Sequence, residues 1–345
     1  MFQVLGMLAA IALTAFCWGV YGPVLHVGSG LLGSALRAFM CVGLAYFGIA
    51  IVVPSAILAR GGEKGRWTRT GVLWSLVAGA AGALGALGVI LALRVFGGQA
   101  VYVMPLVFGG APVVNTLLTA FMNRAFGQLK APFLAGLLLV VTGAVTVLVF
   151  KPQAAPHAAP APAAVAADAE QLAAEPAKTP QRKAERFVEI LLATCMTLFC
   201  WGAYGPVLHR GQAAMGGSRL RPLLCIGIAY FLIAVLVPLA LLRPMGDTGN
   251  WGLGGTMWSL AAGTLGAVGA LGTILAFNCG GKPFTVMPVV FGCAPVINTL
   301  TTLALAHTPT SAISPFFLAG MLVVAVGAAT VLLFGPRGHA PAKPA

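Results

Sequence analysis

The sequence predicts an all-α integral membrane protein with ten transmembrane helices arranged as two inverted five-helix repeats. Three observations predict this fold: an apolar composition, ten long apolar stretches and an internal duplication. Of the 345 residues, 59% are hydrophobic and 8% are charged, and the mean hydropathy is +0.96. Soluble domains average about 25% charged residues, so the composition excludes soluble enzymes and nucleic-acid-binding modules.

The apolar stretches have the length that a membrane-spanning helix needs. About 20 apolar residues cross the ~30 Å hydrocarbon layer as a helix. Ten stretches qualify, namely 3–22, 33–59, 71–93, 99–122, 132–150, 187–206, 221–242, 253–277, 284–306 and 315–334. Their apolar residues are continuous and do not alternate with polar ones, which argues against an outer-membrane β-barrel.

The second half of the chain repeats the first. Residues 16–26 (FCWGVYGPVLH) return as 199–209 (FCWGAYGPVLH), 183 residues later, and residues 103–117 return as 286–300. The Ala- and Pro-rich residues between the copies cannot bury enough apolar area to fold alone. We therefore predict a first repeat at 1–150, a linker at 151–186, a second repeat at 187–335 and a flexible tail at 336–345.

The number of spans in each copy predicts the topology. Each copy holds five spans, and the linker is too polar to add another, so the second copy is expected to enter from the opposite face of the membrane. Outside the linker, twelve Lys and Arg residues fall on the side of the N-terminus and three on the other side. This excess favours a cell (inner) membrane protein with both termini in the cytoplasm.

Spans one and six each carry a polar and aromatic stripe. Its members lie at i, i+4 and i+7, on one helical face. They are Thr14, Trp18 and Tyr21 in the first copy and Thr197, Trp201 and Tyr204 in the second. Such stripes can line a cavity and bind a substrate, or their aromatic residues can anchor helix ends at the membrane interface.

Spans four and nine carry a second stripe that contains prolines. A proline removes a backbone donor, and broken helices at matching places in two repeats indicate a transport site. We predict helix breaks at Pro105, Pro112, Pro288 and Pro295, and substrate-binding side chains at Asn115, Thr116, Asn298 and Thr299. Alternatively, the prolines are packing kinks and the asparagines bond neighbouring helices.

Two further pairs of residues are candidates for the entrances. Arg37 and Arg221 lie a few residues into spans two and seven, near opposite membrane faces. Each is either a snorkelling anchor or a guard that attracts an anionic group. His26 and His209 follow Tyr-Gly-Pro after spans one and six, where they are either hydrogen-bonded polar residues or proton relays.

Several chemistries lack the residues that they need. All seven acidic residues lie outside the hydrophobic cores, and the seven cysteines form no CxxC pair. An intramembrane hydrolase or a carboxylate-driven pump needs a buried acid, and ATP binding at a Walker motif needs its glycine loop. We therefore expect no enzymatic activity, no cofactor and no bound metal.

Three features carry a family resemblance: the Trp-Gly pairs at Trp18 and Trp201, the prolines of spans four and nine, and the duplicated five-span plan. In these features the chain resembles the drug/metabolite transporter superfamily, in particular its EamA-like and glucose/ribose-porter branches. The resemblance covers the chain apart from the linker and tail. It implies secondary transport by alternating access, through a central cavity formed by spans one, three, four, six, eight and nine.

Aromatic faces with Thr and Asn side chains suit a small polar or amphiphilic metabolite, such as a sugar, better than a cation. The expected partners are the lipid bilayer and this small-molecule substrate, and not nucleic acid; the sequence leaves a homodimer open. The alternative function is a channel-like pore or a lipid-handling membrane scaffold without alternating access.

Overall fold

The computed structural model describes residues 2–150, 180–305 and 313–336, and every regular element in these ranges is helical. Ten helical segments are long and apolar enough to cross a membrane, as in a multi-pass membrane protein. The first five segments are α1 (Phe2–Leu32), α2 (Ala35–Tyr46) continued by η1 (Phe47–Val52) and α3 (Val53–Ala59), α4 (Arg69–Ile90) continued by η2 (Leu91–Val95), α5 (Ala100–Met122) and α6 (Ala131–Val149).

The second half has the same series of helices. Its segments are α8 (Pro180–Ala214), α9 (Leu220–Phe231) continued by η4 (Leu232–Leu236) and α10 (Val237–Leu242), α11 (Leu253–Asn278), α12 (Pro283–Leu305) and α13 (Pro315–Phe334). Helix α8 begins inside the predicted linker. Residues 151–179 of that linker and 337–345 of the predicted tail lie outside the described residues.

The first and sixth spans are longer than the sequence predicts. Helix α1 runs to Leu32 through Pro23, and α8 runs to Ala214 through Pro206. The prediction that His26 and His209 follow these spans is therefore wrong, since both lie inside the helices. A proline removes only one backbone hydrogen bond, and the packing of α1 along α11 and of α8 along α4 outweighs that loss.

The predicted helix breaks in spans four and nine are also absent. Helix α5 continues through Pro105 and Pro112, and α12 continues through Pro288 and Pro295. All four prolines are buried in protein, where neighbouring helices support the backbone that they weaken. The prediction was wrong because a lost backbone hydrogen bond only loosens a helix that is packed on several sides.

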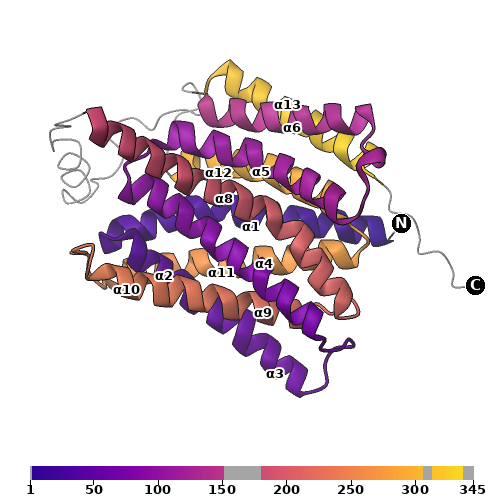
Figure 1. Cartoon of the computed structure of the whole chain (residues 1–345), viewed down its shortest axis with the longest axis horizontal. Helices are drawn as coiled ribbons and strands as arrows, with labels where there is room; N and C mark the ends of the chain where they lie inside the picture. The colour runs from indigo at the N-terminus through magenta and orange to yellow at the C-terminus, as the bar shows by residue number, and fades with distance from the viewer. Residues whose placement is uncertain (1, 151–179, 306–312, 337–345) are drawn as a thin grey trace, which may run out of the picture.

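The helices pack into two bundles, and each bundle mixes the two halves of the chain. Bundle I contains α1, α2, α11 and α12, with α1 lying along α11 and α12. Bundle II contains α8, α9, α4 and α5, with α8 lying along α4 and α5. Figure 1 shows α6 and α13 side by side as an outer layer next to α5 and α12.

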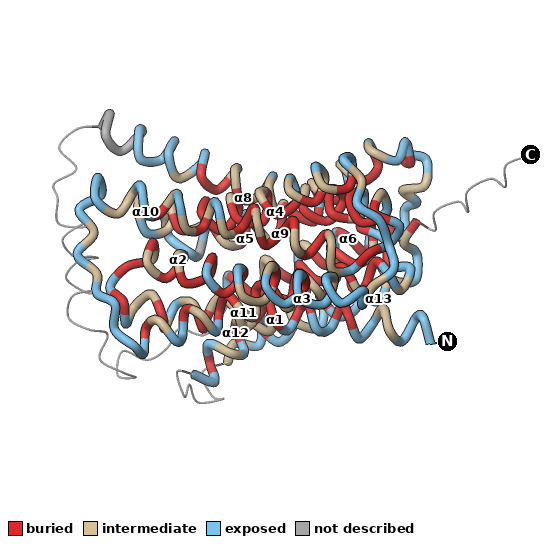
Figure 2. The backbone as a smooth tube through the Cα atoms, turned by 90° about the horizontal axis from the view of Figure 1, so that it is seen from below, coloured by how far each residue is buried: buried red, intermediate tan, exposed pale blue. Residues whose placement is uncertain are grey.

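The two bundles meet mainly along two flanks. At one flank α2 contacts α9 and η4, and at the other α5 contacts α12, whereas α11 makes few contacts with α8. Figure 2 shows the two layers, with buried residues gathered between them and exposed residues on the outside. Helices α1, α11, α4 and α8 therefore surround the centre of the molecule, between the flanks.

The ends of the helices fix two reference points. In Figure 1, α1 begins and α13 finishes at one end of the molecule, which we call the first end. Helix α6 finishes and α8 begins at the opposite end, the second end. Each half of the chain therefore begins at one end and finishes at the other.

Glycines hold each bundle together by admitting bulky side chains from the other half. A Cβ atom on Gly85 of α4 would overlap the Trp201 ring of α8, and one on Gly269 of α11 would overlap the Trp18 ring of α1. Gly88 and Gly272, one turn further along, face Thr197 and Thr14 in the same way. Only glycine leaves the groove that the indole enters, which agrees with the close packing expected of small residues in membrane helices.

We expect Gly85→Ala and Gly269→Ala to destabilise the protein by about 1–3 kcal/mol each, because the added methyl group must displace a packed indole. The matched control is Gly30→Ala in α1, where a Cβ meets no atom within 4 Å. This change should be neutral or stabilising by at most about 1 kcal/mol. Unfolding in detergent measures the change in stability of all three variants. Equal losses of stability at Gly30 and Gly85 would contradict the inference that Gly85 makes room for the indole.

Candidate functional site

The tryptophans and threonines of the predicted stripes are bonded to the backbone of the facing helix. The Trp18 indole donates to the Gly266 carbonyl at 3.3 Å, and the Trp201 indole donates to the Gly82 carbonyl at 3.2 Å. Thr14 and Thr197 likewise reach the carbonyls of Gly269 and Gly85, at 3.2 and 3.0 Å. The hydrogen-bonding atoms of these four residues stabilise the bundles, which leaves their rings and methyl groups for any other contact.

The third residue of each stripe differs. The hydroxyl oxygens of Tyr21 and Tyr204 are buried and have no hydrogen-bond partner among the described residues. The Tyr204 ring packs edge-on against the Trp18 ring, with centroids 5.7 Å apart. This contact joins α1 of bundle I to α8 of bundle II, so the tyrosines lie where the two bundles face each other.

Two more tyrosines, which the sequence analysis missed, lie at the same level. Tyr46 of α2 and Tyr230 of α9 stack with centroids 3.9 Å apart and planes at 4°. The Tyr230 hydroxyl donates to the Gly82 carbonyl at 3.3 Å. Their shared Ala-Tyr-Phe context in the two copies was a signal that could have found them. With Tyr21 and Tyr204, they account for four of the five tyrosines in the chain.

Aromatic rings fill the centre between the bundles. Phe108 of α5 lies 6.1 Å from the Trp201 ring and 6.3 Å from the Phe291 ring of α12, measured between centroids. We call the whole set the aromatic layer; it comprises Trp18, Tyr21, Tyr46, Phe108, Trp201, Tyr204, Tyr230 and Phe291. No member of this layer is charged, and the buried polar residues beside it, Thr14, Asn115, Thr116 and Thr197, are uncharged as well. The layer can therefore stack with and hydrogen-bond to a solute but offers it no buried charge.

The asparagines and threonines of α5 and α12 border this region. Asn115 donates its amide to the Pro283 carbonyl at 2.8 Å, which joins α5 to the start of α12. Its other atom, Oδ1, and the Thr116 hydroxyl are buried without a partner in the described part of the chain. Thr299 instead donates to the Pro295 carbonyl at 3.0 Å, and Asn298 packs against Gly22 of α1. Asn115 thus bonds a neighbouring helix, as the packing interpretation expects. The Thr116 hydroxyl remains unbonded, as the substrate-binding interpretation expects.

Polar contacts also join the bundles at each end. At the first end, the Gln212 amide of α8 donates to the Ile274 carbonyl and to Asn278 Oδ1 of α11, both at 3.0 Å. At the second end, Arg94 Nη2 lies 3.0 Å from His26 Nδ1 of α1. Arg94 and Asn278 are equivalent positions in the two copies. We call these contacts the first-end and second-end latches; both are closed, and they use different chemistry.

Arg37 and Arg221 occupy equivalent ion-paired clusters. Arg37 Nε lies 2.7 Å from Asp247 Oδ1, and its guanidinium lies 5.2 Å from the Trp251 ring centroid. Arg221 lies 3.7 Å from Glu63 Oε2 and 5.7 Å from the Trp67 ring centroid. Each pair joins a residue of one half to the loop before a helix of the other half, within one bundle. The arginines thus hold the helices of each bundle together, a role that neither sequence interpretation included. The ring of His209, the other entrance candidate of the second copy, packs edge-on against the Phe277 ring.

Glu63 is the more extensively bonded of the two carboxylates. Burial raises its pKa, but hydrogen bonds from the Ser218 hydroxyl, the backbone of Arg219 and Leu220, and the Arg219 guanidinium outweigh burial and lower the pKa below its ordinary value of 4.5. The side chain is only 4% exposed. The ionised form of Glu63 therefore ties the loop before α4 to the start of α9.

Because the folded-state pKa is lowered, the Glu63 carboxylate stabilises the fold above its ordinary pKa and loses that contribution as the pH falls through the folded-state value. We expect the melting temperature of the wild type to fall more than that of Glu63→Gln when the pH drops from about 6 to about 4. Thermal unfolding at a series of pH values measures this. Parallel curves for the two proteins would show that Glu63 does not stabilise the fold through its charge.

Comparison with solved structures supports the fold. No protein-family model and no curated protein matches the sequence. Seven chains of solved structures match. One crystal structure superposes with a TM-score of 0.59 and 17% identity, covering 98% of this chain and 99% of that chain. At this identity the likeness shows the fold alone, over the full length of both chains.

Proposed function

We propose that the protein is a secondary transporter that moves a small polar or amphiphilic metabolite by alternating access. The observation that carries this proposal is the arrangement of contacts between the bundles. An uncharged aromatic layer lies in the centre, and a separate polar latch lies at each end. A solute held at the centre is released to one side when that latch opens while the other stays closed.

An inverted pair of repeats, 1–150 and 187–335, supports this mechanism. Equivalent contacts occur twice, as between Trp18 and Gly266 and between Trp201 and Gly82. Each half also begins at one end of the molecule and finishes at the other (Figure 1). An axis in the membrane plane would relate such halves and make the two ends alternate states of one structure. The excess of Lys and Arg at the first end favours a cytoplasmic location for that end and for both termini, in the cell membrane.

The bundles can rock about the two flanks where they touch. Contacts within each bundle are extensive along α1 and α11 and along α4 and α8, whereas contacts across the centre are few. Each bundle is further fastened at one end by its arginine cluster, Arg37 with Asp247 or Arg221 with Glu63. Opening one end therefore needs the latch at that end to break while both bundles keep their internal packing.

The chemistry of the aromatic layer indicates the class of solute. Leaving a buried hydroxyl unbonded costs about 1–3 kcal/mol, and Tyr21 and Tyr204 both carry this cost. A solute with hydroxyl or carbonyl groups would relieve it, and its apolar face would stack on the rings of Trp18, Trp201 and Phe108. No residue of the aromatic layer is charged, which favours a neutral solute over an ion.

Counterflow in proteoliposomes tests alternating access against the two rival functions, a channel-like pore and a lipid-handling scaffold. A thermal-shift screen of sugars, nucleosides and amino acids first finds a solute that stabilises the purified protein. We expect preloaded unlabelled solute to drive transient, saturable accumulation of labelled solute. Flux without counterflow would identify a pore, and no flux for a solute that binds would favour the scaffold.

Tyr21→Phe and Tyr204→Phe test the site itself. Each removes an unbonded hydroxyl, so we expect unchanged or higher thermal stability without solute and weaker solute binding by about fivefold, the equivalent of one hydrogen bond. The control is Tyr102→Phe, whose side chain is 68% exposed on α5 and should bind solute as the wild type does. Titration of the thermal shift gives the apparent affinities. Wild-type affinity in both test variants would remove these hydroxyls from the site.

A further inference from the structure

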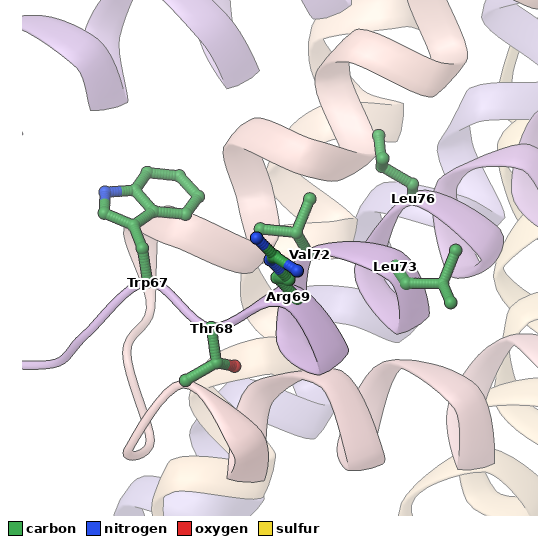
Figure 3. A pocket seen from close by; sticks show the side chains of 6 residues that line it. All are labelled: Trp67, Thr68, Arg69, Val72, Leu73 and Leu76. Carbon is green, nitrogen blue, oxygen red and sulfur yellow. The ribbon is translucent and has the colours of Figure 1, made fainter.

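A groove lies on the outer face of α4 at the first end, away from the aromatic layer. It has a volume of about 420 Å³ and is lined by Trp67, Thr68, Arg69, Val72, Leu73 and Leu76. Figure 3 shows the Arg69 side chain between the Trp67 ring on one side and the leucines on the other. Val72, Leu73 and Leu76 continue along α4 into the span, so the groove has an apolar stem and a basic, aromatic mouth.

The outward surface of the groove is exposed. Trp67 is 50% exposed and Leu73 is 62% exposed. On a span that crosses a membrane, such apolar surface faces lipid chains, while a Trp ring beside the span end lies at the level of the lipid headgroups. In a membrane, the groove therefore opens toward the lipid.

The mouth of the groove carries uncompensated positive charge. Arg69 is exposed and takes part in no ion pair among the described residues, and Arg60, Lys64 and Arg66 of the same loop are exposed as well. The one acid of this loop, Glu63, is bonded to Ser218 and to Arg219. An anionic headgroup at the mouth would thus meet several cations and no free carboxylate from this loop.

The internal duplication shows that the fold does not require these cations. Residues 60–69 (RGGEKGRWTR) correspond to residues 244–253 (PMGDTGNWGL) in the second copy. Both copies keep the acid of the arginine cluster and the tryptophan, as Glu63 and Trp67 or as Asp247 and Trp251. All four basic residues are replaced in the second copy, and Leu253 takes the place of Arg69. The second copy thus builds the same helix start without these four basic residues.

We propose that this groove binds a glycerophospholipid with an anionic headgroup. One acyl chain lies along Val72, Leu73 and Leu76, and the Arg69 guanidinium pairs with the phosphate through two parallel hydrogen bonds. The neighbouring cations favour a headgroup with net negative charge over a zwitterionic one. The site is independent of the central aromatic layer and does not rest on the proposed transport activity.

Native mass spectrometry of the detergent-solubilised full chain tests the site with two lipids of equal chain length, phosphatidylglycerol and phosphatidylcholine. We expect the wild type to bind phosphatidylglycerol more tightly. Arg69→Leu, which installs the residue of the second copy, should weaken phosphatidylglycerol binding about fivefold. It should weaken phosphatidylcholine binding as well, because both lipids carry the phosphate that Arg69 pairs with. Arg69→Gln, which keeps a polar side chain at the position, should show the same loss.

The matched control is Lys130→Leu, which removes one exposed positive charge from another first-end loop, before α6. It should bind both lipids as the wild type does. An equal loss in Lys130→Leu would mean that the lipid senses only the overall charge of this face. Unchanged phosphatidylglycerol binding in both Arg69 variants would likewise overturn the proposal.

Discussion

The fold depends on two indole rings that each enter a glycine groove in a helix from the other half of the chain. Trp18 and Trp201 fill space that any side chain on Gly269 or Gly85 would occupy, and their N–H groups bond backbone carbonyls one turn away. Neither half can complete this packing alone. The halves must therefore interlock, and the product is two bundles of mixed origin in place of two separate repeats.

This constraint also determines which atoms remain for a solute. The polar atoms of Thr14, Trp18 and their equivalents are engaged inside the bundles. The unbonded hydroxyls of Tyr21 and Tyr204, together with Asn115 Oδ1 and the Thr116 hydroxyl, remain for a solute. Each bundle is firmly packed, whereas the two bundles make few contacts across the centre. The bundles are therefore stiff, and the interface between them can open. The two latches lie across the part that can open, one an amide contact at Gln212 and the other a contact between His26 and Arg94.

Composition and span length were enough to predict the helical class, the ten spans and most helix boundaries, since these depend on local apolar runs. The predictions were wrong where packing between helices that are distant in the sequence determines the structure. Pro23 and Pro105 look like helix ends in sequence, yet neighbouring helices carry the backbone through them. The stacking of Tyr46 on Tyr230 and the pairing of Arg37 with Asp247 join residues about 200 positions apart, and no local pattern in either segment indicates its partner.

The central claim is that two stiff bundles move against each other, so that the ends open in turn. Electron paramagnetic resonance distances in a cysteine-free variant test it directly, with spin-label pairs at 213 and 282 across the first end, 31 and 99 across the second, and 31 and 253 within bundle I. With a bound solute, one cross-bundle distance should lengthen while the other stays short, and the distance within the bundle should stay constant. Cross-bundle distances that lengthen together, or a change within bundle I, would contradict it.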